Sequence, residues 1–318
     1  MIKLDLITGF LGAGKTSFLL RYARRLMKKG EKIGILVYDH GAVNVDLPLL
    51  NELRCGRCEL ETLAGSCDAD CHRRRFRTKL ITMAMSGYDR VIIEPSGVFD
   101  MDEFFDTLQE PPLDSRYEIG SVIAVVDAGL EEATAEEEDF FLASQAAAAG
   151  CVLFSKVQCV SPETAKRTLR HLERATERIH GAPIPREDIL IKDWDALTEE
   201  DWDRLSNCGY RTPDYVKTIA GGSAGFQSLS YLDLPEDGAG MREKAESLLH
   251  DASFGAVLRV KGFFREEGTW YQLNATAKES SVTEVPQTRS TITVIGRVLD
   301  ENAVSLLLTG KLPELRHI

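Results

Sequence analysis

Short apolar runs alternate with amphipathic segments through the first two thirds of the chain. The runs at 32–37 and 151–156 have the length and continuity of strands that are buried on both faces. Between such runs, apolar residues recur every three or four positions, which predicts helices. Strands alternating with helices at this spacing predict a parallel sheet covered by helices. The expected strands are 2–7, 32–37, 88–94, 121–126, 151–156 and 189–191, and the expected helices are 16–29, 73–85, 100–108, 140–149, 162–180 and 194–205.

The pattern changes after the glycine-rich stretch at 221–225, which is typical of a linker. Beyond it, strands predominate and helices are fewer. We therefore expect a first domain over 1–215, a linker over 216–225 and a small C-terminal α+β domain over 226–318. In that last domain the expected strands are 226–232, 255–264, 269–276 and 290–298, and the expected helices are 240–249 and 300–308.

A phosphate-binding loop follows the first strand. Gly9, Gly14, Lys15 and Thr16 fit the pattern G-x-x-x-x-G-K-[ST]. Glycines let backbone N–H groups curl around a phosphate, and the following helix N-terminus adds its positive end. Lys15 would reach the β- and γ-phosphates, and the Thr16 hydroxyl would take one Mg²⁺ coordination position. The fold class expected is a P-loop NTPase with a doubly wound, mostly parallel sheet. Nucleotide contacts are expected at Gly9, Gly12, Ala13, Gly14, Lys15, Thr16 and Ser17.

Composition narrows the range of partners. The net charge of −12 argues against DNA or RNA, because neutralising phosphates requires a basic face. No apolar run approaches the roughly 20 residues of a membrane span. The first strand begins at the N-terminus, so no signal peptide is expected before it, and the expected compartment is the cytoplasm. The seven cysteines are then expected to be thiols or metal ligands rather than disulfides.

Two further segments are candidates for a nucleotide-dependent switch. The strand ending at Glu94 continues into Pro95-Ser96-Gly97. Glu94 would hold the Mg²⁺ or its water shell, and the Gly97 N–H would sense the γ-phosphate. Asp39 follows the second strand at the sheet edge where ligand loops gather. Lys15, Asp39 and Glu94 are the candidate catalytic residues, and Thr16, Asp39 and Glu94 are the candidate Mg²⁺ ligands.

Four cysteines fall within seventeen residues. Cys55 and Cys58 have a C-x2-C spacing, and Cys67 and Cys71 have a C-x3-C spacing. The first suits two thiolates on one metal across a tight turn, and the second suits two thiolates on one face of a helix start. Together they could form a four-thiolate Zn²⁺ site or hold an iron–sulfur cluster, with His72 as a spare ligand. A mobile or redox-sensitive thiol cluster is the alternative.

The order of these motifs resembles that of the CobW-like branch of P-loop GTPases, which is related to UreG and HypB. The match includes 8–16, 41–46, 92–97 and 125–127, and in the second domain 259–262, 294–296 and 299–300. This resemblance covers nearly the whole chain. It implies a GTP-hydrolysing metallochaperone or metalloenzyme-assembly factor in which metal and nucleotide binding are coupled.

Three motifs depart from the family's pattern. Residues 65–69 stand where a G-C-x-C-C motif is usual, so the usual three-thiolate site is not present as such. Residues 38–41 replace Asn-Glu-Phe-Gly but keep an acid at Asp39. Ser155-Lys156-Val157-Gln158 replaces the guanine-reading Asn-Lys-x-Asp. Lys156 can still lie over the base, whereas Gln158 has both a donor and an acceptor and could accept adenine. GTP is therefore the leading expectation, and ATP is the alternative.

Three classes of function follow. The leading class is an NTP-hydrolysing metallochaperone or cofactor-assembly factor that binds nucleotide, a transition metal and an unknown client metalloprotein, and that could form a homodimer. A second class is an ATP-dependent activator of a redox or corrinoid enzyme, with a cysteine-ligated cluster. The third, a small-molecule kinase, would need an acceptor pocket that the sequence does not reveal.

Overall fold

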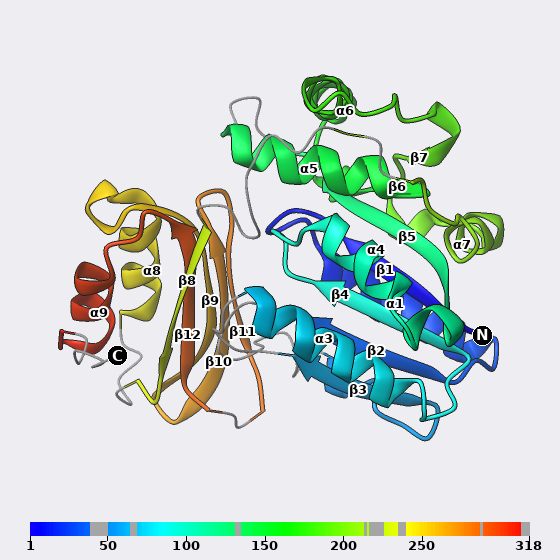
Figure 1. Ribbon diagram of the computed structural model, residues 1–318. Helices are drawn as coiled ribbons and strands as arrows, with labels where there is room; N and C mark the ends of the chain where they lie inside the picture. Colours follow the sequence, from blue (N-terminus) through cyan, green and yellow to red (C-terminus); the bar gives the residue numbers. More distant parts are fainter. Residues whose placement is uncertain are drawn as a thin grey trace. The chain divides into compact units, whose positions relative to one another are not determined.

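The computed structural model describes residues 1–38, 50–63, 69–130, 135–212, 215, 226–234, 240–286 and 289–312. The described chain divides into two compact units, one running to Tyr215 and one starting at Phe226. Each unit has its own sheet (Figure 1). Within the described residues, no helix is long and apolar enough to cross a bilayer.

The first unit is built on a seven-stranded sheet in the order β3-β2-β4-β1-β5-β6-β7, and every pairing in it is parallel. The expected doubly wound, mostly parallel sheet is therefore confirmed. Its strands are β1 (Ile2–Thr8), β2 (Ile33–Tyr38), β3 (Cys58–Leu63), β4 (Arg90–Pro95), β5 (Tyr117–Asp127), β6 (Cys151–Ser155) and β7 (Ile189–Leu190). Its helices are α1 (Lys15–Lys28), α3 (Ala69–Met83), α4 (Met101–Gln109), α5 (Glu136–Ala148), α6 (Pro162–Arg178) and α7 (Glu199–Leu205).

Helices cover both faces of this sheet. Leu4 and Leu6 of β1 belong to a buried core that includes residues of α3, α4, α5 and α6. Asp5 lies between them in the sequence and faces the opposite side, where it accepts a hydrogen bond from Tyr22 of α1 (2.7 Å). In Figure 1, α3 and α4 lie in front of the strands. This alternation explains why nearly every residue of the inner strands is buried.

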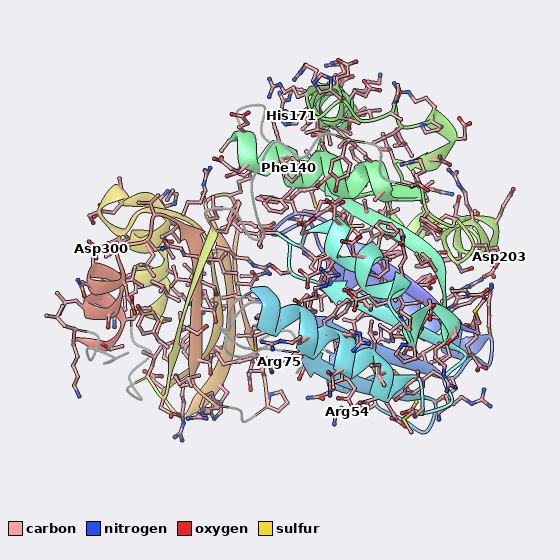
Figure 2. The ribbon with its side chains drawn as sticks, viewed as in Figure 1. Arg54, Arg75, Phe140, His171, Asp203 and Asp300 are labelled. Carbon is pink, nitrogen blue, oxygen red and sulfur yellow. The ribbon has the colours of Figure 1, made fainter. Side chains whose placement is uncertain are left out.

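Helices α5 and α6 pack against each other beside this sheet. The buried Asp139 carboxylate on α5 contacts His171 Nε2 (2.7 Å) and accepts a hydrogen bond from Arg178 (2.7 Å), both on α6. Figure 2 shows His171 on α6 and Phe140 on α5. Asp139 is thus a buried carboxylate that is paired across the helix interface.

Two expectations for the first unit were wrong. Strand β3 was not expected, because its polar residues at Glu59, Glu61 and Thr62 belong to an edge strand that leaves one side partly solvated. The single helix expected over 194–205 is instead a 3₁₀ turn at Trp194–Ala196 followed by α7. Thr198 caps α7 through a reciprocal pair of hydrogen bonds with Asp201.

The second unit is an antiparallel sheet backed by two helices, as expected. Its strand order is β11-β10-β9-β12-β8, and α8 and α9 close a core around Val260, Leu273 and Val294. Strand β11 was not expected. The elements are β8 (Phe226–Leu232), α8 (Met241–His250), β9 (Ala256–Glu266), β10 (Thr269–Thr276), β11 (Ser280–Glu284), β12 (Thr291–Arg297) and α9 (Glu301–Thr309).

Candidate functional site: a nucleotide site at the carboxyl edge of the sheet

The phosphate loop lies between β1 and α1. Gly9, Gly12 and Gly14 all have positive φ, at 147°, 79° and 92°, which side chains rarely tolerate. A Cβ on Gly9 would lie 2.3 Å from the carbonyl oxygen of Val125 on β5, so the loop also needs glycine there for close packing. Lys15 is 7% exposed, and its ammonium donates to the Gly9 carbonyl (2.9 Å). The lysine side chain is therefore folded back over the loop. These backbone conformations are compatible with the phosphate-binding loop that the sequence predicts, and the nucleotide contacts themselves stay a prediction.

The first residue after the loop lysine contacts the strand-end acid. Thr16 Oγ1 donates to Glu94 Oε1 at 2.6 Å, although 78 positions separate the two residues. Glu94 is buried at the end of β4, next to Val37 of β2 in the sheet register. A hydroxyl and a carboxylate held together beside a phosphate loop are the oxygen donors that Mg²⁺ prefers. The two described members of the expected Mg²⁺ set therefore meet, while Asp39 lies outside the described residues.

The Gly97 turn packs directly on the phosphate loop. A Cβ at Gly97 would lie 2.6 Å from the Leu11 backbone nitrogen and 2.9 Å from the Phe10 carbonyl carbon. On its other side, the buried Gln145 amide of α5 donates to the Gly97 carbonyl (3.1 Å). The backbone at Gly97 is thus held between α5 and the phosphate loop, and the expected contact of its N–H with a γ-phosphate stays a prediction.

The base-recognition segment lies at the end of β6. Ser155 is buried, and its Cβ and Oγ lie 3.8 and 4.0 Å from where a Gly14 Cβ would be. Lys156 adopts φ 54° and its ammonium donates to Asp127 Oδ2 (2.8 Å), while Asp127 Oδ1 accepts from the Gly129 N–H (2.8 Å). Gln158 is exposed on the following 3₁₀ turn. The structure therefore brings Ser155 and Lys156 to the sheet edge that carries the phosphate loop.

Sequence reasoning missed Trp194. Its indole N–H donates to the carbonyl of Phe154 (2.9 Å), the residue before Ser155. Its ring edge lies 3.5 Å from where a Gly14 Cβ would be, and the ring packs on Phe18 at 5.5 Å between centroids. A half-buried aromatic ring thus adjoins both the phosphate loop and the base segment. The available signal was its place shortly after the last strand of the sheet, at the ligand edge.

The cysteine cluster is divided by β3. Cys55 and Cys58 pair through their backbones in a tight turn at the start of that strand. Cys71 lies near the opposite end, where it lines a groove of about 460 Å³ with Thr62 and Leu63. A strand of this length spans about 16 Å. One metal ion therefore cannot bind Cys55, Cys58 and Cys71 together. The expected site with all four thiolates on one metal is corrected accordingly.

The two thiols of the turn also differ from each other. Burial raises the pKa of Cys58 to about 12, so its thiol is protonated at neutral pH, whereas Cys55 is exposed. Among the described residues, no group of three or more histidine, cysteine, aspartate or glutamate side chains is placed to hold a metal. Cys67 lies outside the described residues.

Comparison with known proteins identifies the first unit. Residues 4–183, more than half of the chain, match the family model of the CobW/HypB/UreG nucleotide-binding domain. The chain belongs to this family. Its first unit is accordingly the nucleotide-binding domain of a P-loop NTP hydrolase, as the motifs predicted.

Several CobW-family relatives are named zinc chaperones. YeiR of Escherichia coli is 28% identical over 59% of this chain, and the match spans 60% of YeiR. YjiA of E. coli is 26% identical over 84% of this chain and 83% of YjiA. A zinc-bound crystal structure of the YjiA GTPase covers 98% of this chain and 99% of that one, at 22% identity and a TM-score of 0.36. These comparisons do not support the expected iron–sulfur alternative, and the division of the cysteines gives no described ligand set for such a cluster.

Proposed function

We propose that this CobW-family protein is a GTP-hydrolysing zinc chaperone, in which nucleotide state and metal occupancy bias each other. The observation that carries the nucleotide half is the Thr16–Glu94 contact beside the phosphate loop. It joins the end of the loop to the acid that starts the Gly97 turn. Zinc is treated as cargo that the protein receives and hands to a client.

The chemistry expected at the site is largely electrostatic. Phosphoryl transfer needs donors aimed at the oxygens that gain charge, and the loop N–H groups with Lys15 can supply them. Thr16, Glu94 and Asp39 are the proposed Mg²⁺ ligands. The ion would neutralise charge on the phosphate oxygens. Glu94 is suited to this role, because it is buried and holds a carboxylate beside the Thr16 hydroxyl, and Mg²⁺ prefers oxygen ligands of this kind.

We propose GTP as the nucleotide. Support comes from YjiA, a relative over 84% of this chain, which is named a GTPase. Lys156, whose carbon stem can cover a purine while its ammonium stays on Asp127, and the exposed Gln158 would contact either purine. Trp194 would offer the base an apolar face only, because its single N–H already donates to Phe154. A comparison of GTP and ATP binding by calorimetry tests this choice, and tighter binding of ATP would contradict it.

The metal site is proposed around the segment that leads into α3. Cys67 stands where the family's cysteine motif is usual, and Cys71 lies one helical turn further on. We propose that these two thiolates supply zinc ligands, and that Cys55 and Cys58 belong to a separate thiol pair. The proposed recipient is a zinc-requiring client protein, and the proposed nucleotide-bound state is a homodimer, which light scattering with GTP or GDP would test.

The proposal predicts a measurable linkage. Zinc affinity is measured by competition with a chromophoric chelator in the presence of GDP or a non-hydrolysable GTP analogue, and GTP turnover is measured with and without zinc. A difference of about fivefold or more between the two nucleotides is expected. Equal zinc affinities in both nucleotide states would refute the coupling, and absence of GTP hydrolysis would refute the enzymatic half.

A further inference from the structure

Three polar side chains from separate segments meet in the core at the end of β2. The Tyr38 hydroxyl donates to Glu103 Oε1 on α4 at 3.2 Å. His72 Nδ1 on α3 lies 3.0 Å from the same hydroxyl oxygen. The hydroxyl carries a single proton, so when it donates to Glu103 its oxygen accepts from a His72 Nδ1–H. Tyr38 and His72 are 1% and 3% exposed, so water contributes little to either contact.

The Tyr38 ring is also held by aromatic neighbours from the same two sides. It stacks on Phe76 of α3 at 5.2 Å between centroids and 16° between planes. It meets Phe99, which lies between Gly97 and α4, edge to face at 5.5 Å. A ring enclosed in this way has few alternative positions, because close-packed cores shift between discrete arrangements rather than deforming smoothly. A movement of α3 or of α4 therefore acts on Tyr38.

The positions of these residues give the contact its meaning. Tyr38 is the last residue of β2 and directly precedes Asp39, a proposed Mg²⁺ ligand. His72 directly follows Cys71, while Glu103 and Phe99 follow the Gly97 turn. One buried hydroxyl thus links the start of the proposed metal helix to the helix that follows the γ-phosphate-sensing turn.

We propose that Tyr38 is a positioning residue that transmits coupling between the metal site and the nucleotide site, through its hydrogen bonds to His72 and Glu103. This inference rests on the proposed function and adds the route by which the two ligands communicate. Contacts alone establish only a physical path, so the decisive evidence is a coupling measurement.

The test removes one oxygen atom. Tyr38→Phe keeps the ring and its packing but loses both hydrogen bonds. Tyr117→Phe is the matched control, because Tyr117 is also buried in this unit and its hydroxyl donates to the Leu80 carbonyl (2.8 Å), away from the sites discussed. For each protein, zinc affinity is measured with GDP and with a non-hydrolysable GTP analogue, and the ratio of the two affinities is the coupling factor.

The expected coupling factor is about fivefold or more in the wild type and in Tyr117→Phe, and below about twofold in Tyr38→Phe. In Tyr38→Phe, the GDP affinity and the zinc affinity with GDP should stay within about twofold of wild type. A merely structural role would instead weaken both affinities and leave the ratio intact, which would overturn the inference. A wild-type factor near one would instead refute the proposed function. Glu103→Met, which keeps the side-chain length but removes the acceptor, is the second variant if Tyr38→Phe fails to fold, and a wild-type factor in Glu103→Met would likewise overturn the inference.

Discussion

The contact between Gly97 and the phosphate loop gives a sharp prediction for Gly97→Ala. The new Cβ would lie 2.6 Å from the Leu11 nitrogen, about 0.8 Å inside ordinary van der Waals contact. The atoms that the new Cβ would meet include backbone atoms of Leu11 and Phe10, which cannot rotate away as a side chain could. On the other side, Gln145 donates to the Gly97 carbonyl and holds it in place. The φ angle of Gly97 is outside the left-handed range, so alanine adds no backbone strain and the effect is steric.

The two segments must then separate, and the Gly97 N–H moves away from the γ-phosphate position. A displacement approaching 1 Å costs up to about 100-fold in rate when it misplaces a reacting group. Overpacking of this size also costs about 1–3 kcal/mol of stability. We expect kcat for GTP to fall about 30- to 100-fold while GDP affinity changes much less, because GDP has no γ-phosphate.

The assay is single-turnover hydrolysis of radiolabelled GTP, with mant-GDP binding measured in parallel. Gly56→Ala is the matched control: it lies in the same unit, also lacks a positive φ, and a Cβ there would meet nothing within 4 Å. Wild-type turnover in Gly97→Ala, or an equal loss in Gly56→Ala, would refute the reasoning.

Three further predictions follow from the site. Glu94→Gln should reduce kcat by about 100-fold and weaken the Mg²⁺ dependence of turnover, because the charge that would hold the ion is lost; unchanged Mg²⁺ dependence would contradict this role. Trp194→Ala should weaken mant-GDP binding about tenfold through lost stacking, whereas Trp202→Ala, which removes the ring stacked on Phe18 (5.9 Å between centroids), should change it less than threefold. At pH 8, iodoacetamide should label the exposed Cys55 well before Cys58, because a thiol pKa of about 12 leaves only about one Cys58 in 10⁴ ionised. Cys58 labelling should rise about tenfold per pH unit toward pH 10, and mass spectrometry of timed samples measures both rates.

The nucleotide half of the site could be predicted because its chemistry lies in contiguous motifs. The glycine spacing around Lys15 predicts a phosphate loop, and the acid at the end of β4 predicts a residue at the sheet edge. Parallel strands bring their carboxyl ends to the same edge of the sheet. The Thr16–Glu94 contact follows from those two facts. The expected fold class was confirmed for the same reason, while the proposed boundaries at 215 and 226 remain predictions.

What could not be predicted depended on long-range packing. Polar and apolar residues alternate from Cys58 to Glu61, yet the cysteine spacing favoured a metal-binding loop, and the strand that separates the thiols was not predicted. Trp194 belongs to no recognisable motif. Its ring lies beside Gly14 only because β7 pairs with β6 at the edge of the sheet. The Tyr38 contacts likewise join residues from three segments, which a sequence pattern cannot relate.

The close approach of Gly9 to Val125, together with that of Gly14 to Ser155, has a consequence for which part of the molecule can respond to a ligand. Gly9 packs against β5 without room for a Cβ, and Gly14 lies in ordinary contact distance of Ser155 on β6. We therefore expect β1, β5 and β6 to stay fixed relative to the phosphate loop. Nucleotide binding would therefore leave the positions of these three strands unchanged. Any change that distinguishes a triphosphate from a diphosphate would fall to the other side of β1, at the ends of β2 and β4, and a variant meant to alter the switch without altering nucleotide affinity should be sought there.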